Sequence, residues 1–324
     1  MDKRALKRAI KTSPFVRGFV RTVMIPSVRG YLRYAPVAFG KRRLWSVVLM
    51  HFLGLEPPRW DFTARTINGS IISANTRDTV GQYIFYFGVW EPNLTHWLRR
   101  RLLPGDVFVD VGANVGYFTL LASQLVGDSG KVIAVEAHPA IFASLQLNLR
   151  KNRTPNVRAV NCAVWDTEQM ITVYTNPEDL PGQTTVSAAW ADKYHLQPQS
   201  QVSASPLSAI LQPEEIKAAR VIKIDVEGAE WQVVSGMKSI MTSCRDDVEI
   251  ALEVNRKALE AEGKTPQNML DLFREWGFHP YRIENDYLAE RYLYREAPRP
   301  PKRVREICGD QSDIVFSRID AASL

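Results

Sequence analysis

Short apolar runs alternate with segments of helical periodicity through the second half of the chain. The runs enriched in β-branched residues lie at 107–111, 131–136, 157–164, 221–226 and 248–254, and two more follow near "HPYRIE" and "SDIVFSRI". Nearly continuous apolar strands separated by helices are typical of a parallel sheet covered on both faces. The pattern therefore predicts an α/β fold with a mostly parallel, seven-stranded sheet and helices on both faces.

A different pattern occupies residues 59–104. The segments "TINGSIISA" and "QYIFYFG" alternate or are rich in β-branched and aromatic residues, which predicts strands, and Asn68 and Gly69 mark a hairpin turn. The segment "NLTHWLRRRLLPGD" has helical periodicity and stops at Pro104 and Gly105. We expect these strands and this helix to lead into the main domain and to cap its site.

The main domain is expected to span residues 105–324. Residues 165–206 stand apart within it, because the stretch 176–206 is polar, spaced by prolines and without a period. We expect a variable, extended substrate loop over the site, and a plain surface loop is the alternative.

Positive charge is concentrated in an N-terminal arm, residues 1–58. The whole chain has a formal net charge of +6, but residues 1–60 hold 13 Lys and Arg against two acids, so the remainder is mildly acidic. Apolar residues at helical spacing separate these charges, and the longest apolar run, 44–55, is too short to cross a membrane as a helix. The arm is expected to be a helical cap on the body or on a second subunit, or a helix at a membrane surface. Nucleic acid is not an expected partner.

The three cysteines, Cys162, Cys244 and Cys308, are far apart and lack C-x-x-C spacing. They suggest neither a disulfide framework nor a zinc site. Arginines interrupt the first apolar stretch, so no signal peptide is legible. We expect a cytoplasmic protein, with peripheral contact at the inner membrane surface if the arm binds lipid.

The segment "DVGANVGYF" follows the first strand of the main domain, where open α/β sheets form the floor of a ligand crevice. Gly112 and Gly116 suit a tight turn or a close approach to a ligand. Asn114 stands where a dinucleotide-binding loop needs its middle glycine. Asp110, at the strand tip, would repel a pyrophosphate but complement a cationic ligand such as S-adenosylmethionine. These residues and the following Tyr117 are therefore candidate cofactor contacts.

Two further strand ends carry candidate nucleoside contacts. Glu136, after the second strand, can accept hydrogen bonds from both hydroxyls of a ribose, whether of S-adenosylmethionine or of NAD. After the third strand, Ala163 can offer backbone groups to adenine, and Asp166 can meet its exocyclic amine. The structural alternatives are that Asp110 and Asp166 serve turns or caps and that Glu136 pairs with Lys131.

The segment "KIDVEGAEW" places Asp225 and Glu227 at the end of the fourth strand. Methyl transfer to a hydroxyl needs the nucleophile held in line and its proton accepted, so both acids are candidate catalytic residues. His195, in the variable loop, is another candidate base. The motifs N-P-P-Y and D-P-P-Y are absent here, which favours a hydroxyl acceptor over an exocyclic amine. Glu230 is expected to be structural, in the first turn of the next helix.

Aromatic side chains near these strand ends are candidates for the acceptor pocket. Trp90 and Glu91 precede the helix that leads to the glycine loop, and Trp190 and Tyr194 lie in the variable loop. Flat aromatic faces suit sugars and apolar tails, although plain packing is the commoner role.

Glu253 and Asn255 lie two residues apart at the end of the fifth strand, on one side of an extended chain. Together with Asp225 they could hold a hard cation such as Mg²⁺ through oxygen ligands. Hydrogen bonds to substrate or to neighbouring loops are the favoured alternative.

The segments "GDVFVDVGANVGYFTLLAS", "VIAVEAHPAIFASLQLNLRKN" and "VIKIDVEGAEWQVVSGM" together resemble the FkbM-type family of S-adenosylmethionine-dependent methyltransferases. The resemblance runs from Gly105 to Glu253, and the ordered pair D-V-G-A-N-x-G and D-V-E-G-A-E is its specific part. It implies a Rossmann-like class I methyltransferase fold and methylation of hydroxyls on polyketides, glycans or glycolipids. It also implies that the glycine loop contacts the methionine part of the cofactor, Glu136 the ribose, and Asp225 with Glu227 the reacting groups. The usual Glu-Pro after the second strand is here "EAHP".

These observations leave three classes of function open. The first is an S-adenosylmethionine-dependent O-methyltransferase acting on a sugar, glycolipid or secondary metabolite. Both a monomer and a homodimer are compatible with this class. The second is an NAD-dependent oxidoreductase, which shares the sheet and Glu136 but is disfavoured by Asp110 and Asn114. The third is a non-catalytic binding protein with a cofactor fold, which the intact Asp225 and Glu227 disfavour.

Overall fold

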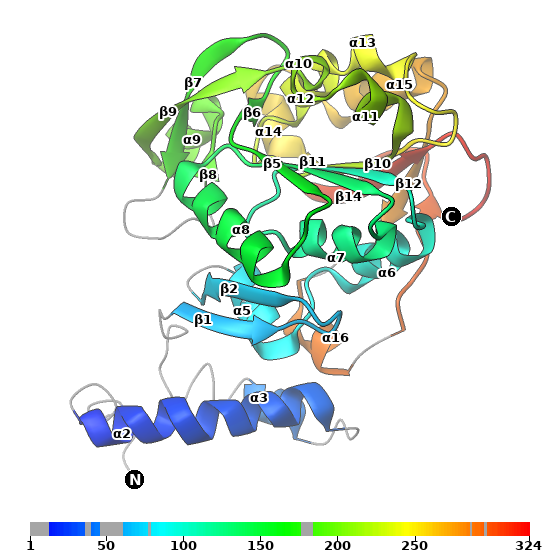
Figure 1. Ribbon diagram of the computed structural model, residues 1–324. Helices are drawn as coiled ribbons and strands as arrows, with labels where there is room; N and C mark the ends of the chain where they lie inside the picture. The colour runs from blue at the N-terminus through cyan, green and yellow to red at the C-terminus, as the bar shows by residue number, and fades with distance from the viewer. Residues whose placement is uncertain are drawn as a thin grey trace.

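The computed structural model describes residues 13–35, 40–45, 61–76, 79–175, 184–285, 287–294 and 297–324. Figure 1 shows a central sheet with helices on both sides. Its strands are, in spatial order, β13 (Lys302–Arg303), β12 (His279–Ile283), β14 (Gln311–Ser317), β11 (Glu249–Asn255), β10 (Ala219–Ile224), β3 (Val107–Val111), β4 (Lys131–Val135) and β5 (Val157–Val160). The strands from β11 to β5 pair in parallel, whereas β14 is antiparallel to both of its neighbours.

The winding of the sheet reverses at β3. From β3 the chain adds β4 and β5 on one side, and it then crosses to add β10 and β11 on the other. The carboxyl ends of β3 and β10 therefore flank the switch point at which open α/β sheets bind their ligands. The predicted seven strands are present among the described residues, and the two-residue strand β13 extends the edge.

Each face of the sheet has its own hydrophobic core, because successive strand residues point to opposite faces. Phe108 of β3 packs on the face of α7, whereas Val107 and Val109 pack on the other face. The helices on the α7 side are α5 (Thr79–Phe87), α6 (Pro92–Arg101), α7 (Tyr117–Val126), α8 (Pro139–Asn152) and α16 (Ala289–Tyr294). The opposite face carries α10 (Leu207–Ile210), α11 (Pro213–Ala218), α12 (Glu230–Gly236), α13 (Lys238–Met241), α14 (Arg256–Ala261) and α15 (Pro266–Glu275).

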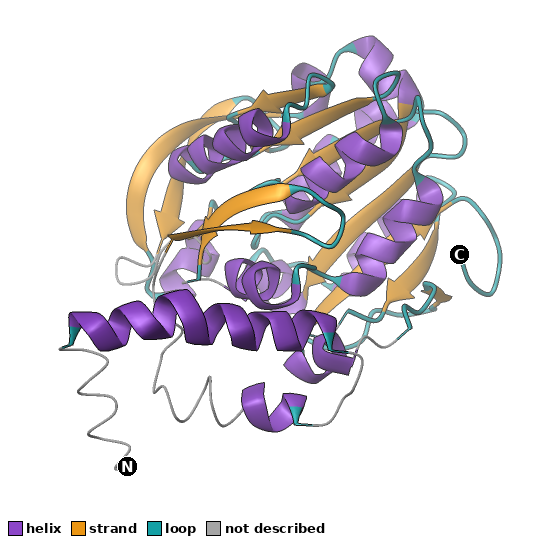
Figure 2. Ribbon diagram, turned by 60° about the horizontal axis from the view of Figure 1, so that its bottom comes forward, coloured by secondary structure: helices purple, strands orange, loops and turns teal. Residues whose placement is uncertain are grey.

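The lead-in segment contains the predicted hairpin, β1 (Asp61–Arg65) and β2 (Ile71–Asn75), which packs beside α8 (Figure 2). The strand expected for "QYIFYFG" is wrong, because these residues belong to helix α5. All five residues from Tyr83 to Phe87 are buried, so the helix shows no polar face in this stretch. A short apolar run of this kind does not distinguish a strand from a buried helix.

The stretch expected to be a loop, 165–206, contributes strands to a small sheet in its described part. The strands of this sheet are β6 (Ala163–Val164), which precedes the stretch, β9 (Gln197–Ser205), β7 (Gln169–Thr175) and β8 (Thr184–Thr185), in that order, with helix α9 (Ala188–Tyr194) beside them. Most of β9 is exposed, with only Val202 and Ala204 buried. Its sequence is polar for that reason, and the alternation expected of a strand is visible only at its end.

The described part of the N-terminal arm is a rod of consecutive helices beneath the body, namely α2 (Pro14–Phe19), the π-helix η1 (Val20–Met24) and α3 (Ile25–Tyr34), followed by α4 (Lys41–Arg43) (Figures 1 and 2). Ile25, Val28 and Leu32 of α3 belong to the core that contains α5. Helix α3 therefore packs against α5 on the body. Most of the apolar run 44–55 lies outside the described residues. None of the described helices has the length and apolar character needed to cross a membrane.

Candidate active site

A cavity of about 400 Å³ opens at the carboxyl ends of β3, β4 and β10. The glycine loop after β3, the turn after β4, strand β6 and the loop after β10 form its floor and sides. Trp90, Glu91 and Tyr287 close the end nearest the lead-in segment. Cavities of this size, about 300–1,000 Å³, hold cofactors and small substrates.

The two glycines of the loop are required by its backbone and its neighbours. Gly112 has φ +77°, and a Cβ atom there would lie 1.8 Å from the carbonyl oxygen of Asp225. Gly116 has φ +93°, and a Cβ atom there would lie 2.6 Å from Leu145 Cδ1. Glycine 112 therefore lets the loop after β3 touch the loop after β10, which brings the two halves of the site together.

Asp110 does not form the floor of the cavity, contrary to expectation. It shares the α7 side of β3 with Phe108, is 1% exposed, and accepts a hydrogen bond from Thr119 Oγ1 at 2.6 Å. The cavity wall carries Lys223 instead, whose Nζ lies 3.8 Å from Asp110 Oδ1. Lys223 is the in-register partner of Asp110 on β10, so both lie on the same side of the sheet, but the longer side chain of Lys223 reaches the cavity. Asp110 acts on the cavity through Lys223, and the acids that face the cavity are Glu91, Glu136, Asp225, Glu227 and Glu253.

Glu136 faces the cavity from the end of β4, as predicted. Its two carboxylate oxygens accept hydrogen bonds from the backbone N–H groups of Asn114 and His138, both at 2.9 Å. Burial raises the pKa of Glu136 to about 7. The alternative partner Lys131 binds Glu215 instead, with Nζ 2.6 Å from Oε1. Glu136 thus keeps its carboxylate available to a ligand in the cavity.

His138 is held by its own hydrogen bonds at the start of α8. Its Nδ1 accepts from the backbone N–H of Ala140 at 3.1 Å, so Nε2 carries the proton and donates to Gln199 Oε1 at 2.5 Å. Burial lowers the pKa of His138. The ring caps the helix and links α8 to β9.

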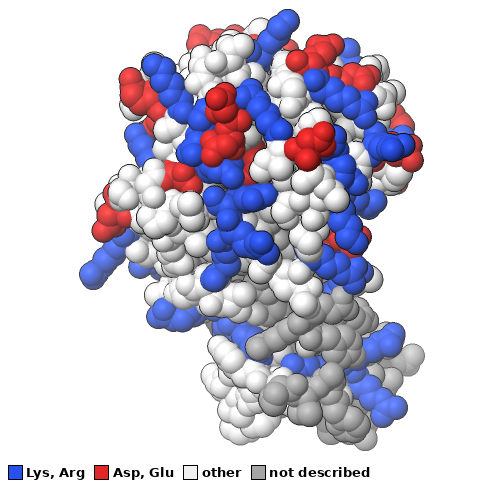
Figure 3. All heavy atoms as spheres, turned by 90° about the vertical axis from the view of Figure 1, so that its right-hand side faces the viewer, with Lys and Arg blue, Asp and Glu red and all other residues white. Residues whose placement is uncertain are grey.

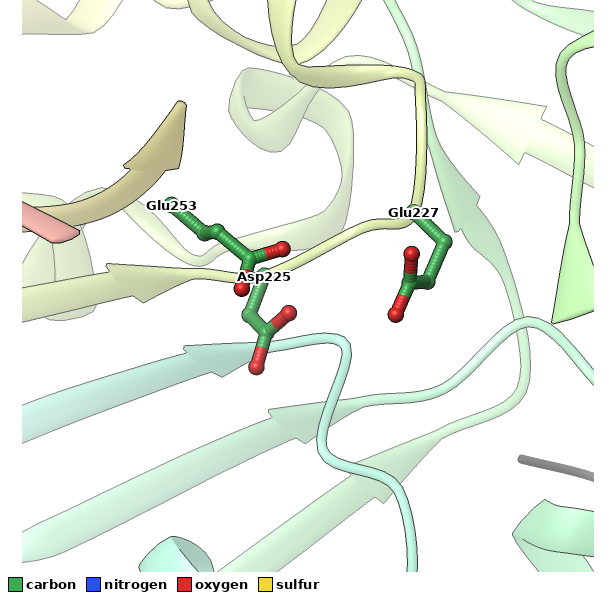
Figure 4. A group of neighbouring side chains, drawn as sticks. All are labelled: Asp225, Glu227 and Glu253. Atoms are coloured by element: carbon green, nitrogen blue, oxygen red, sulfur yellow. The ribbon is translucent and has the colours of Figure 1, made fainter. Parts of the chain in front are cut away.

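Three carboxylates meet where β10 and β11 end (Figure 4). Asp225, Glu227 and Glu253 each place one carboxylate oxygen within 4.8 Å of an oxygen of the other two. Lys223 Nζ forms an ion pair with Asp225 Oδ2 at 2.9 Å. Burial opposes the charge of Lys223, but Asp225 and Asp110 raise its pKa above the ordinary value.

Glu227 is the exposed member of the three, and it faces the cavity. Although part of its surface is accessible, the protein atoms around the cavity remove much of the hydration of Glu227, and this desolvation, together with the charge of Asp225, raises the pKa of Glu227 to about 7. Burial, followed by the charges of Asp225 and Glu227, raises the pKa of Glu253 as well. A carboxyl with a pKa near neutrality can accept a proton from a reacting group and release it again.

The wall contributed by the lead-in segment combines an acid with two aromatic rings. Glu91 is 3% exposed, and its Oε1 accepts a hydrogen bond from Tyr287 Oη at 3.1 Å. The rings of Trp90 and Tyr287 stack with centroids 5.3 Å apart and planes 21° apart. Burial raises the pKa of Glu91 well above its usual range.

Several predicted site residues lie elsewhere. His195 is exposed at the end of α9 and Asp166 is exposed beyond β6, where the chain has turned away from the cavity. Trp190 packs against Gly228, within 3.2 Å of the position of a Cβ atom there, and does not line the cavity. Asn255 caps α14, because its Oδ1 accepts from the N–H groups of Lys257 and Ala258. The Tyr194 side chain is outside the described residues.

The remaining predicted residues line the cavity: Trp90, Glu91, Gly112, Asn114, Tyr117, Glu136, Ala163, Asp225, Glu227 and Glu253. Gly116 does not line the cavity and packs against Leu145. The Tyr117 hydroxyl forms a hydrogen bond with Thr95 Oγ1 at 3.2 Å. Lys223, Tyr287 and Gln311 line the cavity without having been predicted. The signal for Lys223 is a lysine inside an apolar strand, "VIKID", that two acids, Asp225 and Glu227, follow. No pattern marks Tyr287.

The strand order and the cavity at the switch point define a Rossmann-like methyltransferase fold of class I. The methyltransferase FkbM domain matches residues 110–280. The chain therefore belongs to the FkbM family of S-adenosylmethionine-dependent methyltransferases. The resemblance stated from the two motifs is confirmed.

Individual relatives agree with this assignment. "Methyltransferase 1" of Beauveria bassiana is 29% identical over 165 residues, which cover 46% of this chain and 66% of that protein. "31-O-demethyl-FK506 methyltransferase FkbM" of Streptomyces tacrolimicus is 30% identical over 169 residues, 45% of this chain and 64% of that protein. The chain thus spans slightly less than two thirds of the length of these relatives.

Solved structures with similar folds share little sequence with this chain. The methyltransferase FkbM of Methylobacillus flagellatus KT is 13% identical and covers 93% of this chain and 60% of its own, with a TM-score of 0.38. The S-adenosylmethionine-dependent O-methyltransferase TM0748 of Thermotoga maritima is 13% identical and covers 80% and 78%, also with a TM-score of 0.38. Neither superposition is close enough to bear on the site.

Proposed function

We propose that the protein transfers a methyl group from S-adenosylmethionine to a hydroxyl of a sugar, glycolipid or secondary metabolite. The observation that carries the proposal is the arrangement of acids in one cavity, with Glu136 after β4 and Asp225 and Glu227 after β10. The glycine loop lies between these two ends. Membership of the FkbM family supports the cofactor.

S-adenosylmethionine would lie across the glycine loop. Its ribose hydroxyls would bind Glu136, its adenine would contact the backbone near Ala163, and its methionine part would follow Gly112 and Asn114. The sulfonium and ammonium groups would face acids at both ends of the cavity, an environment that favours a cation. Among the described residues that line the cavity, Lys223 alone is a lysine or an arginine, and its charge is already paired with acids. The remaining acids of the cavity would therefore repel the pyrophosphate of NAD strongly.

Glu227 is the proposed general base. The acceptor oxygen attacks the methyl carbon, the S–CH₃ bond breaks, the O–CH₃ bond forms, and the hydroxyl proton passes to Glu227. The products are a methyl ether and S-adenosylhomocysteine. Asp225, held by Lys223 at 2.9 Å, would orient the acceptor rather than take its proton. The stacked rings of Trp90 and Tyr287 offer a flat wall for a sugar or an apolar acceptor.

The test is incubation of the full chain with S-adenosylmethionine carrying a labelled methyl group and extracts fractionated into glycans, glycolipids and small metabolites. The expected result is label in an ether that resists mild alkali, with S-adenosylhomocysteine formed in equal amount. Label in methyl esters or on nitrogen would contradict the proposed acceptor. If the protein binds S-adenosylmethionine but no fraction of the extract acquires label, the non-catalytic alternative is favoured.

We also propose that the outer side of the arm touches an anionic membrane surface. Phe15, Phe19 and Val23 are 82%, 54% and 48% exposed and lie four residues apart, away from the core contacts of α3. The face shown in Figure 3 has basic and acidic side chains over the main body, whereas among the described residues drawn in its lower part, around the arm, Lys and Arg are visible and no Asp or Glu is. Apolar groups beside basic ones are typical of interfacial helices.

Co-sedimentation with vesicles tests this second proposal. Phosphatidylglycerol vesicles should retain the protein and phosphatidylcholine vesicles should not, and Phe15→Ser with Phe19→Ser should release it. Ile67→Ser, at a hairpin position that is 60% exposed, is the matched control and should change nothing. Equal binding of the double variant, or concentration-dependent dimerisation in place of vesicle binding, would overturn the membrane contact.

A further inference from the structure

The carboxylates of Asp225, Glu227 and Glu253 converge from two neighbouring strand ends. Asp225 and Glu227 follow β10, and Glu253 is near the end of β11, which pairs with β10 in parallel. One oxygen of each side chain lies within 4.8 Å of the other two. Figure 4 shows the three side chains gathered around one region of the site.

One carboxylate oxygen in this group is buried without a hydrogen-bond donor. Glu253 is 7% exposed; one oxygen accepts from Gln311 Nε2, whereas Oε2 has no hydrogen-bond partner among the described residues. A buried oxygen of this kind costs free energy unless a donor or a cation satisfies it. The side chain is therefore poised for a ligand that supplies positive charge.

The basic side chains of the site do not balance this charge. Lys223 Nζ binds Asp225 Oδ2 at 2.9 Å and also faces Asp110 at 3.8 Å. No ion pair joins Glu227 or Glu253 to a basic side chain within the described ranges. One ammonium thus serves two acids, and two further carboxylates face each other without a counter-charge.

We propose that Asp225, Glu227 and Glu253 bind a hard divalent cation, Mg²⁺ or Mn²⁺, one oxygen each. Oxygens bound to Mg²⁺ at about 2.0–2.1 Å lie about 3 Å apart in adjacent positions and about 4.2 Å apart in opposite ones. The three carboxylate oxygens already lie within 4.8 Å of one another, so rotation of their side chains brings them to such positions. The ligand set differs from the one expected from sequence, because Asn255 caps a helix and Glu227 takes its place.

The part of the cation in catalysis rests on the proposed function. Three protein oxygens leave coordination positions for an acceptor, and a cation-bound hydroxyl loses its proton more readily. Two adjacent hydroxyls would fill two positions better than one, so the site favours acceptors with a vicinal diol, such as sugars.

The experiment is calorimetric titration of the chelator-treated full chain with Mn²⁺ and with Mg²⁺. The expected result is one saturable site that Glu253→Gln weakens by about tenfold or more, the loss expected for removing a charged ligand group. Glu260→Gln, at an exposed glutamate of α14, is the matched control and should bind as the unchanged protein does. Absence of saturable binding at millimolar cation, or equal binding by Glu253→Gln, would overturn the proposal.

Two further measurements keep the outcomes distinct. S-adenosylhomocysteine binding by Glu253→Gln shows that this variant is folded, and its ligand-free form should melt no lower than the unchanged protein because a repulsion has been removed. Methyl transfer that persists in excess EDTA, with no cation bound, contradicts the cation site and leaves the proposed function standing. Cation binding without any methyl transfer contradicts the proposed function and leaves the site standing.

Discussion

Lys223 determines how the acids around the cavity are balanced. Its ammonium lies 2.9 Å from Asp225 and 3.8 Å from Asp110, and both charges raise its pKa. Glu227 has no such partner among the described residues, and its pKa rises to about 7. Two acids two residues apart in the sequence therefore have different chemistry, since one is paired with a cation and the other can exchange a proton near neutral pH.

Replacing Glu227 with glutamine should separate chemistry from binding. We expect Glu227→Gln to lower kcat by about 10²–10⁴-fold, because general-base catalysis contributes that much, while S-adenosylhomocysteine binds with unchanged affinity. A base works only when deprotonated, so kcat of the unchanged protein should fall as the pH drops through about 7.

Steady-state kinetics across this pH range give both quantities, with Glu260→Gln as the surface control. A rate that Glu227→Gln leaves unchanged would assign the proton to another group, of which the nearest are Glu253 and a cation-bound water. A pH profile that stays flat through neutrality would count against Glu227 in the same way.

Parallel strands bring their carboxyl ends to one edge, so the strand ends indicate which residues line the cavity. Glu136, Ala163, Asp225 and Glu227, which were chosen by this reasoning, do line it. The direction of a side chain was harder to predict, and Asp110 lies on the α7 side of β3. Local sequence also does not show whether a polar residue such as Asn255 caps a helix or binds a ligand. Nor does it show which distant segments, such as the one that contains Tyr287, contribute side chains to the cavity.

Helix α3 is joined to the body by one buried arginine. The Arg33 guanidinium is 5% exposed and donates to the carbonyl oxygens of Ile84, Phe85 and Tyr86, and of Arg65. The first three belong to the last turn of α5. The carbonyl of Ile84 also accepts from the N–H of Gly88, whereas those of Phe85 and Tyr86 lie beyond the last hydrogen bond within the helix. Arg33 thus caps α5 from another helix, although burial lowers its pKa to about 10.

Replacing Arg33 with lysine should destabilise the whole protein. An ammonium cannot reach four carbonyls in one plane, so we expect Arg33→Lys to lower the free energy of unfolding by about 3 kcal/mol. Arg43→Lys, at an exposed arginine of α4, should change it by less than about 0.5 kcal/mol. Urea denaturation measures both. Equal stability of the two variants would show that the arm is a detachable anchor rather than part of the core.

The strands of the central sheet were predicted correctly, whereas helix α5 and strand β9 were not. The strands of the central sheet are apolar because both faces are covered, and they were recognised from that property. Helix α5 is apolar for the same reason and was mistaken for a strand. Strand β9 is mostly exposed and was mistaken for a loop. In both elements the contacts that decide the conformation come from distant parts of the chain.

The molecule as a whole keeps several acids buried around the switch point. Burial raises the pKa of Glu136 to about 7 and that of Glu230 to about 8, and both residues are almost inaccessible. In the unfolded chain a glutamate titrates near pH 4.3, so the folded state holds more protons between about pH 5 and pH 8. The free energy of unfolding must then fall as the pH rises through this range.

Thermal melting of the ligand-free protein measures this linkage. We expect the midpoint to fall by several degrees between about pH 5.5 and pH 8.5, since each pKa unit corresponds to about 1.4 kcal/mol. Glu230→Gln should reduce the slope, because it removes one of the groups that must ionise in the interior. A midpoint that rises with pH in both proteins would show that these carboxyls are already ionised in the fold.

Calorimetric titration of the full chain with S-adenosylhomocysteine and, separately, with NAD distinguishes a methyltransferase site from a dinucleotide site, because both ligands offer a ribose to Glu136 but only NAD carries a pyrophosphate. We expect saturable binding of S-adenosylhomocysteine, weakened by about tenfold or more in Glu136→Gln, and no binding of NAD. Tight binding of NAD with no binding of S-adenosylhomocysteine would contradict this expectation.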